Sequence, residues 1–92
     1  TVASKADGDN LAIGVNYFAD LTSNATVTLP ASNAILTGQS IVVQAANLTG
    51  AKIIINTQAL AQKVDGENSV EIESPNGAIT LVYVAENDFR II

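Results

Sequence analysis

Residues 51–59 read AKIIINTQA, and the three consecutive isoleucines of this stretch decide what kind of fold the chain can form. Most of the remaining sequence alternates apolar and polar residues, which is the period-two pattern of a strand with one wet face. A small single sheet of that kind has nowhere to put Ile53, Ile54 and Ile55 together. The stretch therefore predicts a strand that is covered on both faces, either within the chain or by a neighbouring one.

Two other stretches alternate cleanly and predict half-buried strands. NATVTLP at 24–30 places Val27 inward, and NSVEIES at 68–74 places Ile72 inward and Glu71 outward. Further runs are short, rich in Val and Ile and apolar on both faces, which favours buried strands over helix. These runs lie around residues 41–43, 53–55 and 78–85.

Turn signals separate these runs and indicate the fold class. Gly residues and Asp-Gly or Asn-Gly pairs recur at the short intervals that are typical of a sandwich or barrel. We therefore expect an all-β fold, a compact and jelly-roll-like sandwich or barrel of about seven or eight short strands. A single β domain covers residues 11–92 and follows a polar N-terminal arm at residues 1–10.

Three segments of this domain have weaker patterns. Residues 11–19 predict a strand that is interrupted at Gly14. Residues 30–36 predict a loop that carries Ile35 and Leu36 back into the core. Residues 57–64 are ambiguous between a helical turn and irregular structure, because they are few and have no firm cap.

The composition limits the chemistry that the chain can perform. There is no Cys, His, Met or Trp, which removes disulfides, thiolate metal sites, the usual general base and the most reactive nucleophile. A net charge of −5, with four scattered basic residues, disfavours binding to nucleic-acid phosphates. No apolar run approaches the roughly 18 residues of a membrane span. We therefore expect no enzymatic activity, no cofactor, no nucleic-acid partner and no membrane partner.

Two acidic turns raise the question of a calcium site. DGDN at 7–10 and DGEN at 65–68 place oxygen ligands at alternate positions around a glycine, as a hard cation needs. Neither turn has the spacing of an EF-hand loop, and Asp-Gly is a common turn dipeptide whose side chain caps its own backbone. The turn interpretation is therefore favoured over the calcium interpretation. The candidate ligands are Asp7, Asp9 and Asn10 in the first turn and Asp65, Glu67 and Asn68 in the second.

Glu71 and Glu73 form a pair of carboxylates with two interpretations. A glycosidase uses two carboxyl groups that face each other across a cleft. Glu71 and Glu73 instead occupy successive outward positions of one predicted strand, where charged side chains discourage edge-to-edge pairing. We favour the second interpretation, a solvated strand face.

Several parts of the sequence, taken in order, resemble a module of tailed-bacteriophage virion proteins. The resemblance covers roughly residues 24–92, and the chain departs from it at Phe89, where the family often has Trp. It implies a non-enzymatic building block of fibres, spikes or capsid decorations that assembles as a trimer without a cofactor, and it implies no catalytic residues. The matching parts are TVTLP at 26–30, GQSIVV at 38–43, KIIIN at 52–56, the DG turn at 65–66, ITLVYV at 79–84 and FRII at 89–92.

From this resemblance we expect a virion structural protein, a capsid decoration or cement protein that stabilises the shell from its exterior. The expected partners are copies of the chain, as a homotrimer, and the major capsid protein or other virion proteins. The polar arm is expected to order on docking. The residues expected to pack in the core or at an interface are Ile53, Ile54, Ile55, Phe89 and Ile91.

Two other functions stay open at this point. Within the same class, the chain is a domain of a phage tail fibre or spike that attaches to the host. From another class comes a carbohydrate-binding module, whose stacking platform would be Tyr17 or Tyr83 beside asparagine side chains.

Overall fold

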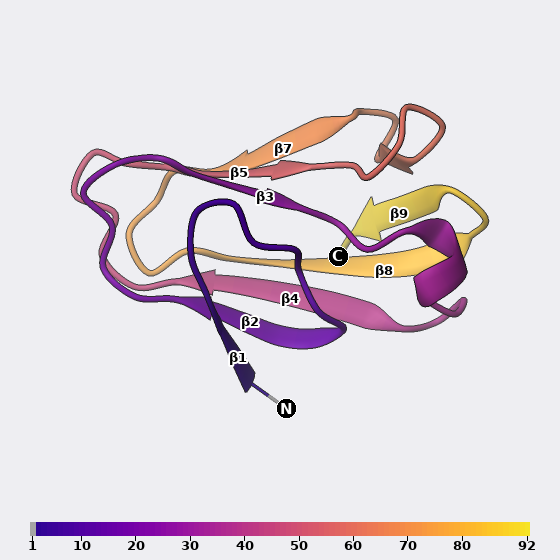
Figure 1. Cartoon of the computed structure of the whole chain (residues 1–92), viewed down its shortest axis with the longest axis horizontal. Helices are drawn as coiled ribbons and strands as arrows, with labels where there is room; N and C mark the ends of the chain where they lie inside the picture. Colours follow the sequence, from indigo (N-terminus) through magenta and orange to yellow (C-terminus); the bar gives the residue numbers. More distant parts are fainter. Residues whose placement is uncertain (1) are drawn as a thin grey trace.

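The strands of the chain build two sheets that face each other across one core (Figure 1). The computed structural model describes residues 2–92. Within these residues there is no α-helix, and the predicted all-β class is confirmed with nine strands. The larger sheet contains, in spatial order, β1 (Val2–Lys5), β2 (Gly14–Phe18), β4 (Ser40–Ala45), β8 (Ala78–Ala85), β9 (Asp88–Ile91) and β6 (Lys63–Val64). The smaller sheet contains β3 (Ala25–Thr28), β5 (Ile53–Asn56) and β7 (Ser69–Ile72), and a 3-10 turn, η1 (Ser32–Ala34), follows β3.

The core lies between the two sheets and is built from alternate residues of the strands. Val27 and Ile72 point inward, as the alternation of their stretches predicted. Burying an aliphatic side chain of this size contributes roughly 1.5–3 kcal/mol to the free energy of folding. The largest fully buried side chains on the strands are those of Phe18, Phe89, Ile41, Ile53, Ile55 and Leu81.

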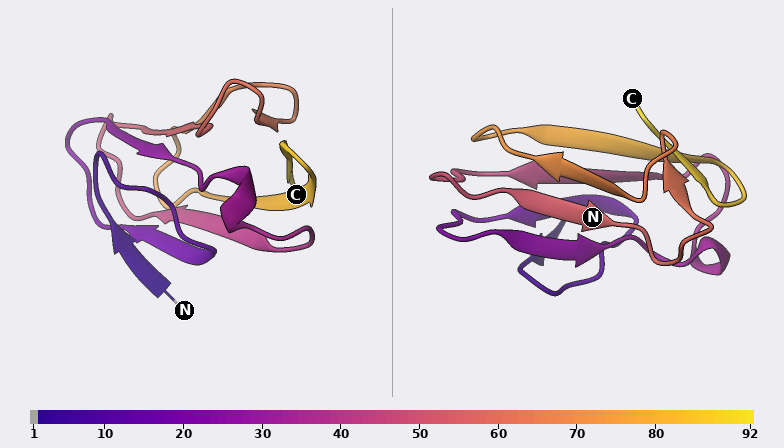
Figure 2. Two further views of the ribbon diagram at one scale, coloured as in Figure 1. Left: turned by 45° about the vertical axis from the view of Figure 1, so that its right-hand side comes forward. Right: turned by 90° about the horizontal axis from the view of Figure 1, so that it is seen from above.

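The chain changes sheet at each step from β2 to β5. β2 and β4 are parallel neighbours in the larger sheet, and β3 and β5 are parallel neighbours in the smaller one. The backbone thus winds around the core as a coil, and β7 and β8 then return antiparallel to β5 and β4 (Figure 2). The expected likeness to a jelly roll is wrong, because a jelly roll consists of antiparallel strands, whereas four of the seven strand pairs in residues 2–92 are parallel.

The three isoleucines of β5 are accommodated within the chain. Ile53 and Ile55 are fully buried in the core, whereas Ile54 is half-buried on the outer face of the smaller sheet. On that face Ile54 lies opposite Thr26 of β3 and Glu71 of β7. Side chains in facing positions of a sheet are close enough to cover one another in part. The second sheet therefore covers one face of β5, and neighbouring strands shield the single isoleucine on the other.

The N-terminal segment is joined to both sheets rather than set apart as an arm. β1 pairs in parallel with β2, and the Gly8 N–H donates to the Thr26 carbonyl at 2.8 Å. The side chain of Leu11 is buried in the core. The expected boundary between an arm and a domain at residue 10 is therefore not seen in residues 2–92, because the backbone groups of this segment find partners on β2 and β3. Thr1, the first residue of the expected arm, lies outside the described residues.

Two loops differ from, or complete, the sequence prediction. The loop after β3 carries Ile35 into the core, but Leu36 is 72% exposed, so the prediction for Leu36 is wrong. Gly38 follows with a φ of 94°, and this left-handed turn directs the chain into β4 rather than returning Leu36 inward. The ambiguous segment 57–64 forms a turn that ends in the two-residue strand β6.

Candidate docking face

The outer face of the larger sheet carries a row of three valines and a threonine that nothing else in residues 2–92 covers. Val2, Val15, Val42 and Thr80 are aligned across β1, β2, β4 and β8 by the strand registers. Val15 and Val42 are half-buried by their neighbours, and Val2 at the sheet edge is 69% exposed. No segment of residues 2–92 crosses this side of the sheet (Figures 1 and 2).

The rows on either side extend this surface. In one, Tyr17 of β2 lies on the same face as Gln44 of β4 and Ala78 of β8. In the other, Val82 of β8 lies opposite Ser40 of β4, and Val84 follows at the end of β8. We call this surface the docking face, and define it by Val2, Ser4, Val15, Tyr17, Ser40, Val42, Gln44, Ala78, Thr80, Val82 and Val84.

The docking face has no charged side chain of its own. A charged residue that borders the face and points the same way is Arg90 of β9, opposite Val82. Its Nε donates to Asp88 Oδ1 at 3.0 Å, and this bond, together with the charge of Asp88, raises the pKa of Arg90 above its ordinary value. The charges of this pair cancel, Lys63 of β6 lies next to Asp88, and the docking face itself is uncharged on a chain whose net charge is −5.

The outer face of the smaller sheet is polar and provides a comparison within the same molecule. Thr26, Thr28 and Asn56 point outward from β3 and β5. Lys52 Nζ and Glu71 Oε1 form an ion pair at 3.2 Å beside the half-buried Ile54. A strand face that meets only water is expected to look like this one. Of the two outer faces, that of the larger sheet is therefore the more apolar.

The interface residues expected from the sequence lie mostly elsewhere. Ile53, Ile55 and Phe89 are fully buried between the sheets, where no neighbouring chain can reach them. Ile54 retains part of its surface on the polar face, and Ile91 is 40% exposed near the C-terminal end of β9. Core packing, the other role expected for this set, is what the structure gives to Ile53, Ile55 and Phe89.

The valines and Tyr17 of the docking face were missed as a functional set. The sequence does indicate a second apolar face for two of these strands, because SIVVQA and AITLVYVA are apolar at both sets of alternate positions. One set of alternate residues in these strands fills the core, and the other set forms the docking face. Strand order was needed to show that Val42, Val82 and Val15 come from neighbouring strands and form one surface.

The carboxylates of the two acidic turns bond to the backbone. Asp7 Oδ1 accepts the Thr26 N–H at 2.8 Å, and Asp9 Oδ2 accepts the Ala6 N–H at 2.9 Å. In the second turn, Asp65 Oδ1 accepts the Ile91 N–H at 3.1 Å, and the Asn68 amide donates to Thr57 Oγ1 at 3.0 Å. Residues 2–92 hold no group of three or more acidic side chains close enough together to share a metal ion. Only Asp9 caps its own turn, whereas Asp7 and Asp65 join their turns to the backbone of other segments, at Thr26 and Ile91.

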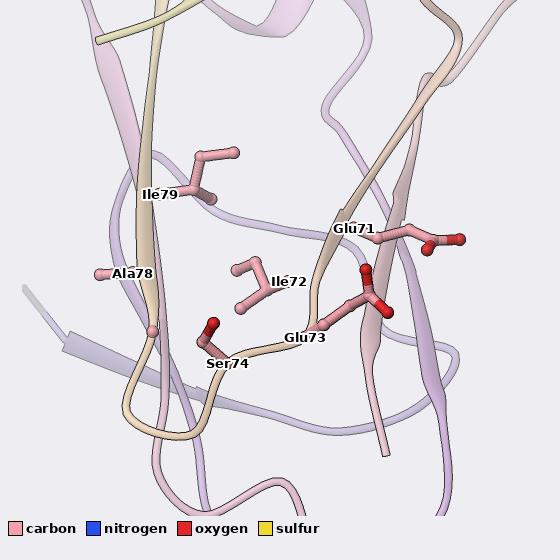
Figure 3. A pocket seen from close by; sticks show the side chains of 7 residues that line it. Glu71, Ile72, Glu73, Ser74, Ala78 and Ile79 are labelled. Carbon is pink, nitrogen blue, oxygen red and sulfur yellow. The ribbon is translucent and has the colours of Figure 1, made fainter. Parts of the chain in front are cut away.

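Glu71 and Glu73 lie beside a shallow depression of about 240 Å³ between β7 and β8. Ile72 and Ile79 point into the gap, whereas both glutamate side chains point away from it (Figure 3). Glu71 is already paired with Lys52. This arrangement is a solvated strand face and not a pair of carboxylates across a cleft.

The aromatic residues offer little for a sugar platform. Tyr83 is 4% exposed and packs against Phe89, with ring centroids 4.9 Å apart. Its hydroxyl accepts the Asn87 N–H at 2.9 Å, so the ring is held inside the fold. Tyr17 is 39% exposed but lies among the valines of the docking face rather than beside asparagines. A second hollow of about 300 Å³ is lined by Ala31, Ser32, Asn33, Gln58, Ala59, Gln62 and Asn87, and contains no aromatic ring.

Comparisons with known proteins add no relative to this picture. No family model matches the chain, and no curated protein matches it either. Among residues 2–92, the structure has no helix with the length and hydropathy needed to cross a membrane. The functional argument therefore depends on the surfaces described above.

Proposed function

We propose that the chain is a non-enzymatic structural protein of a tailed-phage virion, a capsid decoration protein that stabilises the shell from outside. The observation that carries this proposal is the docking face, with its row of Val2, Val15, Val42 and Thr80 in register across four strands. A neutral, flat and β-branched surface supports binding by shape to another protein. A location in the virion is supported by the order of sequence parts that resembles phage virion modules.

The physical role follows from where the binding free energy is gained. A protein that binds an assembled shell, and not its separated subunits, stabilises the assembled state in proportion to its affinity and concentration. Burial of a valine contributes roughly 1.5 kcal/mol at the low end of the range for aliphatic side chains. The docking face offers Val15, Val42 and Val82 already half-ordered by their strand neighbours, so little side-chain entropy is lost on binding.

The proposed partners are copies of this chain and the major capsid protein. In this arrangement the docking face holds neighbouring proteins together, and the polar outer face around Thr26 and Glu71 stays in contact with water. No catalytic step or cofactor is part of this proposal.

A second candidate, a domain of a tail fibre or spike, is favoured by one observation. The backbone coils from β2 to β5, so that β4 lies parallel to β2 and β5 lies parallel to β3. Successive repeats are stacked in this way in β-helices and solenoids. Elongated proteins are built by continuing such a stack. β1 extends it by one more parallel strand at the edge of the larger sheet.

Virions of the phage that encodes the chain provide the test. We expect antibodies against the purified protein to label capsids in electron micrographs, and capsids that lack the protein to release their DNA at a lower temperature. Labelling of the tail alone would favour the fibre or spike domain. Virions with neither label, or capsids of equal heat resistance with and without the protein, would contradict the decoration role.

A further inference from the structure

We infer that the docking face binds a second copy of this chain, with the two larger sheets stacked face to face about a twofold axis that runs along β4. This inference rests on the proposed function, because it names the partner of the same face. It replaces the homotrimer that the resemblance led us to expect with a pair.

Charge is the first argument for a second copy. Two identical molecules of charge −5 repel one another over most of their surfaces. None of the residues that define the docking face carries a charge, and Arg90 and Asp88 beside it are paired at 3.0 Å. The polar outer face of the other sheet carries Lys52 and Glu71 and offers no comparable apolar row. The docking face is therefore where two copies approach at the lowest electrostatic cost.

Shape is the second argument. β2 and β8 are the two neighbours of β4, and hydrogen-bonded strands lie about 4.8 Å apart, so an axis along β4 places β2 of one copy over β8 of the other. The row of Tyr17, Gln44 and Ala78 then meets itself in reverse order. The bulky Tyr17 ring lies over the small Ala78 of the second copy on both sides of the axis.

The residues on β4 itself meet their own equivalents. Val42 contacts the second copy's Val42 at the centre of the apolar row. Gln44 faces the second copy's Gln44, and a pair of primary amides satisfies both partners because each has donors and an acceptor. Val15 lies over the second copy's Thr80, which presents a methyl group as well as a hydroxyl. The face is thus complementary to itself under one rotation, as a closed pair requires.

The area of the docking face determines how strongly two copies are expected to associate. Four strands about 4.8 Å apart and about five residues long cover an area of about 300 Å² on each copy. The total of about 600 Å² is well below the roughly 1,200 Å² at which stable protein interfaces begin. The pair is therefore weak and forms in a concentration-dependent manner, and it strengthens where many copies are held side by side on one assembly.

Sedimentation of the purified full chain tests the inference. Between about 10 μM and about 1 mM, we expect the mean mass to rise from that of one chain toward twice 9.5 kDa. Val42→Lys should keep the mass at one chain over the whole range, because it places two lysines against each other on the axis. Ile54→Lys is the matched control, since Ile54 is also a half-buried β-branched residue but lies on the opposite outer face, and this variant should associate like the unmodified chain. Circular dichroism checks that both variants are folded.

Cross-linking provides a second, independent test of the pairing of two copies. The chain has no cysteine, so Val42→Cys introduces a single thiol near the axis. A bis-maleimide of about 10 Å, the spacing of stacked sheets, should join two such chains, and Glu73→Cys on the other sheet should give much less dimer. A chain that stays monomeric at about 1 mM, a mass of three chains, or equal cross-linking at both sites would overturn the inference. None of these results bears on antibody labelling of virions, so the proposed function is tested separately.

Discussion

Asn16 and Ala12 are joined by two hydrogen bonds between one side chain and one backbone unit. Asn16 Oδ1 accepts the Ala12 N–H at 2.8 Å, and Asn16 Nδ2 donates to the Ala12 carbonyl at 2.8 Å. The same Nδ2 also donates to the Val42 carbonyl at 3.1 Å. Asn16 is fully buried. Its side-chain amide pairs with the N–H and the carbonyl of Ala12, as a neighbouring strand would, where the backbone turns at Gly14.

Replacing Asn16 by leucine should therefore be costly despite the similar side-chain volume. The change removes the partners of the Ala12 backbone groups, and each buried polar group left unpaired costs about 1–3 kcal/mol. We expect urea denaturation to show a loss of at least about 2 kcal/mol in the free energy of unfolding. Asn33→Ala, at an exposed position after β3, is the control and should change stability by less than about 0.5 kcal/mol. Equal losses for the two variants would contradict this role of Asn16.

The isoleucines of β5 should differ in their contribution to stability. Ile55→Ala empties part of the core, and such substitutions cost about 2–5 kcal/mol. Ile54→Ala removes a half-buried side chain from the polar outer face and should cost less than half as much in the same experiment. Comparable losses at both positions would mean that the outer face of the smaller sheet is covered in solution.

Gln62 should hold the turn after β5 against η1. Its Oε1 accepts the Gln58 N–H at 2.7 Å, and its Nε2 donates to the Pro30 carbonyl and to Ser32 Oγ, each at 3.0 Å. Gln62→Ala is expected to lower the free energy of unfolding by about 1–3 kcal/mol, because these buried groups lose their partner. Hydrogen exchange of the Gln58 amide should accelerate more than that of Ile41 in β4. Uniform acceleration at both amides would show only a global loss of stability.

The positive charge of Arg90 should strengthen the association of two copies. The Arg90 guanidinium is always positive, and its ion pair with Asp88 balances one negative charge beside the docking face. Arg90→Gln leaves Asp88 unbalanced, and we expect weaker association at low salt that recovers as salt screens the repulsion. Lys5→Gln makes the same change in net charge on the opposite side of the sheet, in register with Phe18, and should have a smaller effect. Sedimentation in low and high salt compares the two variants.

Calcium should leave the thermal stability unchanged. Asp7, Asp9 and Asp65 each already accept a backbone N–H, from Thr26, Ala6 and Ile91 respectively. We expect the same melting temperature with excess calcium and with EDTA. A higher melting temperature in calcium that Asp65→Asn abolishes would establish a metal site in the second turn.

The sequence predicted the strands better than it predicted their arrangement. Period-two alternation identified the inward residues Val27 and Ile72 because burial on one face leaves a local pattern. Which strands become neighbours depends on contacts between distant parts of the chain, and no local pattern records the parallel pairing of β2 with β4. For this reason Val15 and Val42 could be recognised as strand residues but not as parts of one surface.

Because local patterns do not record contacts between distant segments, most of the interface residues expected from the sequence lie in the core instead. Three adjacent isoleucines predict a strand that is apolar on both faces. In the middle of the three-stranded sheet, however, β5 places only Ile54 on the outer face. The N-terminal residues looked like an arm because Val2 to Lys5 are few and mixed in polarity. Their pairing with β2 is carried by backbone groups, which every sequence has.

The coil from β2 to β5 also has a consequence for how the protein is made. Val15 meets Val42, and Ala25 meets Ile53, only after a strand of the opposite sheet has been laid down between them. β8, which lies between β4 and β9, comes near the end of the chain. Folding dominated by such distant contacts is slow, on the order of milliseconds to seconds. A nascent chain on the ribosome can pair β2 with β4 and β3 with β5 well before its end is made, but the edge of β4 stays unpaired until β8 has been synthesised. The yield in the cell therefore depends on how well this edge is kept from other chains in the meantime.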